Sequence, residues 1–173
     1  MKSLYSIAIC PPEDVVQKVS EYKKRLADAI GWYRSKNSEA HITFNLFSAD
    51  ERILAIWETY MRWLSFLIAP FPVTLDSTDH FKNGAFFLKP NQESLQSLRE
   101  FMNYFNLHSP LSAQTQNNPH VSIGRGLSEK NLQIAKEMIR NINLKFLCDN
   151  LAIRKYNPDK QQYEVISRTY FNS

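Results

Sequence analysis

Glycine and cysteine are scarce in this sequence, and long apolar runs are absent. Four of the 173 residues are glycine, and no G-x-G-x-x-G or G-x-x-x-x-G-K-[ST] pattern occurs, so a glycine-rich phosphate loop is not expected. The two cysteines, Cys10 and Cys148, form no C-x-x-C pair, which excludes a zinc ribbon. No run reaches the roughly 18 apolar residues that a membrane span needs, and the short apolar stretch 4–10 runs into Pro-Pro-Glu-Asp rather than a signal-peptide cleavage site. We therefore expect a cytoplasmic protein with reduced cysteines and no membrane contact.

Composition indicates one folded domain spanning residues 1–173. Hydrophobic residues make up 43% of the chain and charged residues 22%, which suits a packed interior and argues against disorder. The net charge of +4 is too small to specify an anionic partner. Residues 140–173 carry a net charge of +3, and the residues before them carry only +1. We interpret this cluster first as a solvated hairpin, and alternatively as a basic rim beside an anionic ligand.

Hydrophobic periodicity predicts strands alternating with four helices. Short apolar runs predict strands at residues 4–10, 41–44, 71–76, 84–88, 119–123, 144–148, 151–156 and 163–171. The apolar stripe of the first helix consists of Val15, Val19, Tyr22, Leu26 and Ala29, and Gly31 ends that helix. Ser48 is expected to cap the second helix through an S-x-x-E box, residues 95–105 form the third, and Ser128 caps the fourth.

The order of these elements repeats within the chain. His41 and His120 each lie 30 residues after a proline that follows an apolar run. Each histidine begins the same pattern of histidine, apolar, hydroxyl and apolar residue, which is His-Ile-Thr-Phe in one case and His-Val-Ser-Ile in the other. The matched pattern and spacing indicate two similar halves, roughly 1–80 and 81–173, within the single domain.

Each motif places its histidine and its hydroxyl on one face of a strand. Residues i and i+2 of a strand face the same side, so His41 lies beside Thr43, and His120 lies beside Ser122. The apolar residues of each motif face the opposite side and can anchor the strand on helices. If a pseudo-twofold axis relates the two halves, both polar pairs can meet across that axis.

Two imidazoles and two hydroxyls at one cavity suit phosphoryl transfer without a metal. One neutral histidine can accept a proton from the attacking group, and the other, when protonated, can donate one to the leaving oxygen. The hydroxyls of Thr43 and Ser122 can donate hydrogen bonds to the non-bridging phosphate oxygens. We assign His120 as the base and His41 as the acid, and the symmetry of the motifs lets these roles exchange between forward and reverse reactions.

Other interpretations of the histidines stay open. A single histidine beside a hydroxyl is most often structural, and only the duplication favours catalysis. Two histidines are also possible zinc ligands, but no third ligand stands at a suitable spacing and no H-E-x-x-H occurs. We therefore expect no metal and no cofactor. His80 and His108 lie in weakly patterned segments, and we expect both on the surface.

The two motifs resemble those of the 2H phosphoesterase superfamily, in particular its bacterial 2′-5′ RNA ligase and cyclic phosphodiesterase (LigT-like) group. The opening Leu-Tyr-Ser-Ile-Ala-Ile-Cys-Pro-Pro-Glu at 4–13 is similar to the first strand and helix start of that group. Arg125, two residues after the second motif, stands where the group often carries an arginine. The likeness follows the order and spacing of almost the whole chain, with serine in the second motif where threonine is commoner.

The resemblance implies an α+β fold with two lobes, a pseudo-twofold duplication in which two antiparallel sheets flank a central cleft and helices lie outside. It implies metal-free, ATP-independent hydrolysis of 2′,3′-cyclic phosphates of nucleotides or RNA ends, with reversible 2′-5′ RNA ligation as a further activity. It also implies that His41 and His120 are the acid/base pair and that Thr43, Ser122 and Arg125 bind the phosphate. The expected protein is a monomer whose partner is a nucleotide or RNA end with a 2′,3′-cyclic phosphate or a 2′-5′ linkage.

Two other functions are compatible with these residues. One is a non-catalytic RNA- or nucleotide-binding module of the same fold, which would show salt-sensitive binding without turnover. The other is an enzyme of this fold with a substrate outside nucleic acids. Modest basicity favours a small nucleotide over a long RNA. Tyr5, Trp32 and Phe87 can stack on a base, but such residues are more often core residues.

Overall fold

The structure, a computed structural model, describes residues 2–172. Within these residues the chain forms four helices and nine strands, which confirms the predicted α+β class. The helices are α1 (Glu13–Ile30), α2 (Glu51–Ser65), α3 (Gln92–Leu107) and α4 (Glu129–Met138). The strands are β1 (Ser3–Ile9), β2 (Ile42–Ala49), β3 (Phe71–His80), β4 (Phe86–Pro90), β5 (Gln114–Thr115), β6 (Val121–Gly124), β7 (Leu144–Cys148), β8 (Asn150–Asn157) and β9 (Gln162–Tyr170).

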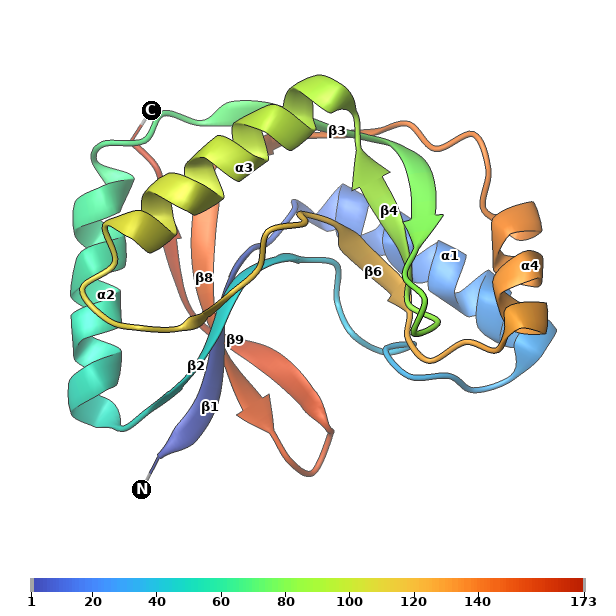
Figure 1. Cartoon of the computed structure of the whole chain (residues 1–173), viewed down its shortest axis with the longest axis horizontal. Helices are drawn as coiled ribbons and strands as arrows, with labels where there is room; N and C mark the ends of the chain where they lie inside the picture. Colours follow the sequence, from blue (N-terminus) through green and yellow to red (C-terminus); the bar gives the residue numbers. More distant parts are fainter. Residues whose placement is uncertain (1, 173) are drawn as a thin grey trace.

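Two antiparallel sheets carry the strands, as predicted (Figure 1). The five-stranded sheet has the order β5-β2-β1-β8-β9, and the four-stranded sheet has the order β6-β4-β3-β7. Helix α2 packs on the first sheet and α3 on β3 and β4, whereas α1 packs on β6, β7 and α4. The sheets do not follow the order of the chain, because β3 pairs with β4 and β7, and β8 returns to pair with β1. The division into similar halves near residue 80 stays a prediction, and the sheets join elements from both sides of that point.

The apolar residues of both motifs lie in the core, as predicted. These residues are Ile42, Phe44, Val121 and Ile123, and all four are fully buried. The Phe44 ring packs edge-on against α3, with its centroid 5.1 Å from that of Phe101 and 5.6 Å from that of Phe105. Burial of a phenylalanine side chain stabilises the fold by about 2 kcal/mol. The buried face of the strand therefore fixes the direction in which its polar face points.

A bulge interrupts each motif strand at the equivalent place. In β2, the register shift against β1 leaves Phe44 without a directly opposite partner. In β6, the register shift against β4 leaves Ile123 without one. Both bulges fall at the last residue of the four-residue motif. A bulge bends a strand and redirects its side chains. The two motifs are therefore similar in local backbone geometry as well as in sequence.

Two local predictions about the helices are wrong. Ser48 lies inside β2, and Asp50 caps α2 instead, its carboxylate accepting a hydrogen bond from the amide of Ile53 at 3.1 Å. The longer strand takes up the first two residues of the predicted capping box. In α1, Ala29 is exposed and Lys23 is buried, because the buried stripe follows four-residue steps from the start of the helix.

Two helix boundaries agree with the sequence patterns, and the third helix is longer at both ends than the predicted 95–105. Gly31 follows α1 with a φ of +81°, which glycine adopts without strain. The Ser128 hydroxyl accepts a hydrogen bond from the amide of Asn131 at 3.2 Å and caps α4. None of the helices within residues 2–172 is long and apolar enough to cross a membrane.

Candidate active site

The two motif histidines make the same hydrogen bond from the same position. His41 lies one residue before β2, and its Nδ1 donates to the carbonyl oxygen of Glu39 at 2.7 Å. His120 lies one residue before β6, and its Nδ1 donates to the carbonyl oxygen of Asn118, also at 2.7 Å. A carbonyl oxygen only accepts, so Nδ1 carries the proton of each neutral ring and Nε2 is left with a free lone pair. Both imidazoles are therefore held in the tautomer in which Nε2 can take up a proton.

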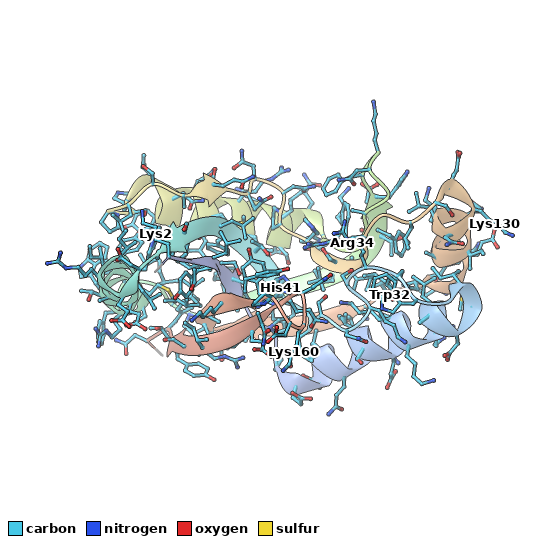
Figure 2. The ribbon with its side chains drawn as sticks, turned by 90° about the horizontal axis from the view of Figure 1, so that it is seen from below. Lys2, Trp32, Arg34, His41, Lys130 and Lys160 are labelled. Atoms are coloured by element: carbon cyan, nitrogen blue, oxygen red, sulfur yellow. The ribbon has the colours of Figure 1, made fainter. Side chains whose placement is uncertain are left out.

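A cavity of about 470 Å³ opens beside His41. Its walls come from residues 32–38, the end of β6, strand β8 and the β8–β9 hairpin. Figure 2 shows His41 near the middle of the molecule, with Trp32, Arg34 and Lys160 around it. The charged residues of the lining are Arg34, Lys36, Arg125, Arg154, Lys160 and one acid, Asp159. The lining thus carries five cations and one anion, a charge balance that favours an anionic ligand.

Arg154 is the buried cation of this cavity, and the sequence motifs do not reveal it. It lies on β8 and is only 3% exposed, and its guanidinium donates to the carbonyl oxygen of Tyr163 at 2.9 Å. No carboxylate within residues 2–172 forms an ion pair with it. Burying a charge without a counter-charge destabilises a fold. A buried guanidinium that lines a cavity and has no ion-pair partner is chemically suited to bind an anion.

Burial and positive charge together keep His41 neutral. Burial, followed by the charge of Arg154, holds the pKa of His41 well below its ordinary value of 6.5. The hydrogen bond to the Glu39 carbonyl acts in the opposite direction, and Lys23 and Arg125 lower the pKa further. At neutral pH the ring is uncharged in the free protein. An anion in the cavity offsets the three cations and so raises this pKa.

His120 lies against aromatic rings instead. Its ring centroid is 4.7 Å from that of Phe87 and 5.5 Å from that of Phe81, and His120 does not line the cavity beside His41. Burial lowers the pKa of His120, the hydrogen bond to Asn118 opposes this shift, and the charge of Arg125 adds to it. Because Arg125 lowers the pKa of both motif histidines, it lies within electrostatic reach of both.

The two hydroxyls lie on the predicted faces of their strands. In the first sheet, Ser6 of β1 pairs with Arg154, and Ala8, two residues further on, pairs with Thr43. Thr43 therefore shares a sheet face with Arg154. In the second sheet, Ser122 pairs with the phenylalanine whose ring contacts His120. Each hydroxyl is thus placed on the same side of its sheet as a candidate catalytic or anion-binding group.

Lys23 holds the segment that leads into the first motif. It lies on α1 and is 2% exposed. Its Nζ donates to the carbonyl oxygens of Ser35 at 3.1 Å and Ser38 at 2.6 Å, and to the hydroxyl of Ser38 at 2.9 Å. Burial, together with two nearby arginines, lowers the pKa of Lys23 to about 7. This lysine positions part of the cavity wall without belonging to either motif.

The segment before the first motif also contacts the strand of the second. The amide of Arg125 donates to the carbonyl oxygen of Arg34 at 3.1 Å, and these two residues form an isolated antiparallel bridge. The hydroxyl of Ser35 donates to the carbonyl oxygen of Ile123 at 3.4 Å. These contacts bring the approach to His41 and the end of β6 into the same part of the molecule.

The structure unites part of the predicted site. His41 and Arg125 line one cavity, and Arg125 connects that cavity electrostatically with His120. His80 and His108 are exposed, as predicted. Within residues 2–172, no group of three His, Cys, Asp or Glu side chains is arranged to hold a metal ion.

Of the three aromatic residues considered for base stacking, Trp32 alone lies at this cavity. Its side chain is 74% exposed, whereas Tyr5 and Phe87 are buried. An exposed indole at the rim of an anion-binding cavity is available to stack on a ligand base.

Comparison with known protein families matches residues 11–160 to the 2′-5′ RNA ligase superfamily. Among solved structures, the apo form of Escherichia coli LigT is 14% identical, with 99% of each chain covered and a TM-score of 0.68. TT0787 of Thermus thermophilus is 18% identical, with 97% of each chain covered and a TM-score of 0.65. E. coli LigT complexed with 3′-AMP is 13% identical over the whole of both chains, with a TM-score of 0.66. No curated protein sequence matches the chain, and at these identities the structural likeness shows a shared fold.

Proposed function

The chain belongs to the 2′-5′ RNA ligase superfamily of 2H phosphoesterases, and we propose that it hydrolyses 2′,3′-cyclic phosphates of nucleotides or RNA ends without a metal ion. The observation that carries this proposal is the pair of carbonyl-anchored imidazoles: His41 lines a cation-rich cavity, and His120 lies within electrostatic reach of Arg125 from the same lining. Hydrolysis of a cyclic phosphodiester needs one proton taken from water and one given to the leaving oxygen. Two histidines with free Nε2 atoms supply both transfers, and reversible 2′-5′ ligation uses the same groups in reverse.

The phosphate is held by charge and by hydroxyl groups. Arg154 and Arg125 line the cavity and can donate charge-assisted hydrogen bonds to the non-bridging oxygens. Thr43, on the same sheet face as Arg154, and Ser122 can donate further hydrogen bonds. The negative charge of the phosphate compensates the buried guanidinium, so binding favours substrates that carry a phosphodiester over neutral ones.

His120 acts as the base and His41 as the acid. His120 is neutral among aromatic rings, and its Nε2 takes a proton from the attacking water. The water oxygen forms a bond to phosphorus, and the bond from phosphorus to one ribose oxygen breaks. His41 is neutral until the substrate offsets the cations around it, and it then becomes protonated and donates from Nε2 to the leaving ribose oxygen. Substrate binding thus prepares the acid.

The test is turnover in the presence of EDTA. Purified protein incubated with 2′,3′-cyclic mononucleotides, 2′-5′ dinucleotides and short RNAs ending in a 2′,3′-cyclic phosphate should convert a cyclic substrate into one monophosphate isomer. Loss of activity in EDTA that returns with a divalent cation would contradict the two-histidine mechanism. Absence of turnover with every substrate would contradict the proposed function.

The runner-up function is a nucleotide- or RNA-binding module without catalysis. The unpaired, buried Arg154 supports it, because a charged cavity binds an anion whether or not chemistry follows. This alternative predicts binding that weakens steeply with salt, with the ligand recovered unchanged. Turnover of any substrate in the same panel would exclude it.

A further inference from the structure

A second cavity, of about 800 Å³, lies between the β3–β4 hairpin and α4. The charged residues of its lining are Lys82 from the hairpin, Lys130 and Lys136 from α4, and one acid, Glu129. None of the three lysines forms an ion pair with a carboxylate in the described part of the chain. Lysines that surround a hollow and are not neutralised by carboxylates attract anions. This cavity therefore has the character of an anion site separate from the one beside His41.

An aromatic ring connects the second cavity with the His120 motif. Phe81 lines the cavity, and its ring centroid is 5.5 Å from that of His120 and 4.6 Å from that of Phe87. Phe81 thus lines the lysine cavity on one side and contacts the candidate catalytic residue His120 on the other. Aromatic side chains next to a basic groove are typical of proteins that bind single-stranded nucleic acid, because the rings stack on bases while the cations contact phosphates.

Gly84 holds the hairpin firmly against the segment that follows β6. Its φ is +81°, and a Cβ atom at this position would collide with the backbone of Leu127. The amide of Leu127 donates to the carbonyl oxygen of Gly84 at 3.0 Å. Because Leu127 follows Arg125 closely in sequence, this contact fixes the lysine cavity relative to the phosphate-binding arginine.

The distribution of charge follows the same two cavities. Together they are lined by eight of the 21 lysine and arginine residues and by two of the 17 acidic residues. The rest of the chain is therefore net acidic, and the small overall charge conceals two concentrated basic regions. Figure 2 shows Lys130 at one end of the molecule and His41 near its middle.

We propose that the lysine cavity binds the phosphodiester backbone of a single-stranded RNA whose cyclic-phosphate end occupies the histidine site. This inference rests on the proposed function. The RNA runs from the His41 cavity past Phe81 towards the lysine cavity. Phe81 stacks on a base, and Lys82, Lys130 and Lys136 contact backbone phosphates on the 5′ side of the cyclic end. A mononucleotide has no such phosphates, so the second cavity makes the protein prefer RNA ends over cyclic mononucleotides.

The test compares Lys130→Gln/Lys136→Gln with a control of equal charge change, Lys2→Gln/Arg52→Gln. Lys2 and Arg52 are exposed, and Figure 2 shows Lys2 far from Lys130. Substrates are a 2′,3′-cyclic mononucleotide and a short single-stranded RNA with the same cyclic end. We expect the Lys130/Lys136 variant to raise the KM for RNA at least tenfold more than the KM for the mononucleotide. The control variant should leave both KM values unchanged. Equal changes for both substrates, or an equal effect of the control, would overturn the inference.

A binding measurement separates this inference from the proposed hydrolysis. The affinity for a single-stranded RNA with a non-hydrolysable 3′-phosphate end is measured by fluorescence anisotropy at several salt concentrations. Loss of two phosphate contacts should weaken binding and reduce the slope of log affinity against log salt by about 1.4, at about 0.7 per contact. An unchanged slope overturns the inference even if cyclic mononucleotides are hydrolysed. A reduced slope supports it even if no substrate is turned over, and circular dichroism checks that each variant is folded.

Discussion

His41 and His120 share their position before a strand, their tautomer and the bulge three residues later, but they differ in what surrounds them. Three cations lower the pKa of His41, whereas His120 packs against two aromatic rings and has its pKa lowered by a single arginine. Both rings are kept neutral, one by burial and charge and the other mainly by burial. A phosphate bound as proposed would offset three cations at His41 and only Arg125 at His120. Two motifs with the same local backbone geometry thus hold their histidines in different electrostatic surroundings.

The largest expected effect comes from removing either imidazole. His41→Ala and His120→Ala should each lower kcat by about 10²–10⁴-fold, because each loses one proton transfer. Turnover of a 2′,3′-cyclic nucleotide in EDTA measures this loss. His108→Ala, which removes an exposed histidine, is the matched control and should keep full activity. Full activity in either variant would contradict the proposal that both histidines take part in the same reaction.

Substituting Arg154 and Arg125 should show that the pKa values of the two histidines depend on different arginines. Arg154→Gln should lower kcat/KM by about 10²-fold through loss of a phosphate-binding group, and Arg125→Gln should also lower it. NMR titration of the imidazoles should show that Arg154→Gln raises the pKa of His41 alone, whereas Arg125→Gln raises both pKa values, because a lost positive charge makes protonation easier. In the pH profile of kcat/KM, the limb that reports His41 should move to higher pH in both variants, and the limb that reports His120 should move only in Arg125→Gln. If Arg154→Gln shifted the pKa of His120 as well as that of His41, the two histidines would not have separate electrostatic surroundings.

The hydroxyls test whether the two motifs contribute equally to phosphate binding. Thr43→Val and Ser122→Ala should each reduce kcat/KM by about tenfold, the effect of one lost hydrogen bond of roughly 1.4 kcal/mol. Both substitutions keep the shape of the side chain approximately constant. If one variant keeps the activity of the unsubstituted protein, phosphate binding depends on one motif only, and the duplication does not extend to the chemistry.

The smallest effect on rate is expected for Lys23, which acts on the His41 side only. Lys23→Met should lower kcat a few-fold, raise the pKa of His41 and leave His120 unchanged. Lys23 loses its proton near pH 7 in the folded protein but near 10.5 in the unfolded chain. Between these values the unfolded chain binds more protons, so the free energy of unfolding rises with pH by up to about 1.4 kcal/mol per pH unit from this group. Urea unfolding at pH 7 and pH 9 should show that the variant lacks this increase.

Much of the candidate site was accessible to sequence analysis because its pattern is local. Each motif occupies four consecutive residues, so strand alternation alone predicts that Ile42 and Phe44 are buried and that Thr43 lies on the other face. Periodicity predicts the strands and helices, and the resemblance implies the α+β fold with two antiparallel sheets that the structure has. What alternation does not predict is the bulge at Phe44, since it depends on the pairing with β1.

The residues that the sequence analysis missed are brought to the site by long-range packing. Lys23 carried a signal, since it lies at four-residue spacing between Val19 and Ala27, and all three are buried on one face of α1. Arg154 carried a weaker one, as a charged residue ending an apolar strand run. Its place beside His41 depends on β8 returning to pair with β1, and no short pattern indicates that pairing.

The bridge between Arg34 and Arg125 has a consequence for motion. It ties the segment before β2 to the end of β6, so the two sheets cannot swing apart as rigid bodies without breaking it. For the proposed nucleotide ligand, this contact favours entry by side-chain motion at the cavity over separation of the two sheets. We therefore expect the cavity to be largely preformed, so that the backbones of the free and ligand-bound forms superimpose closely.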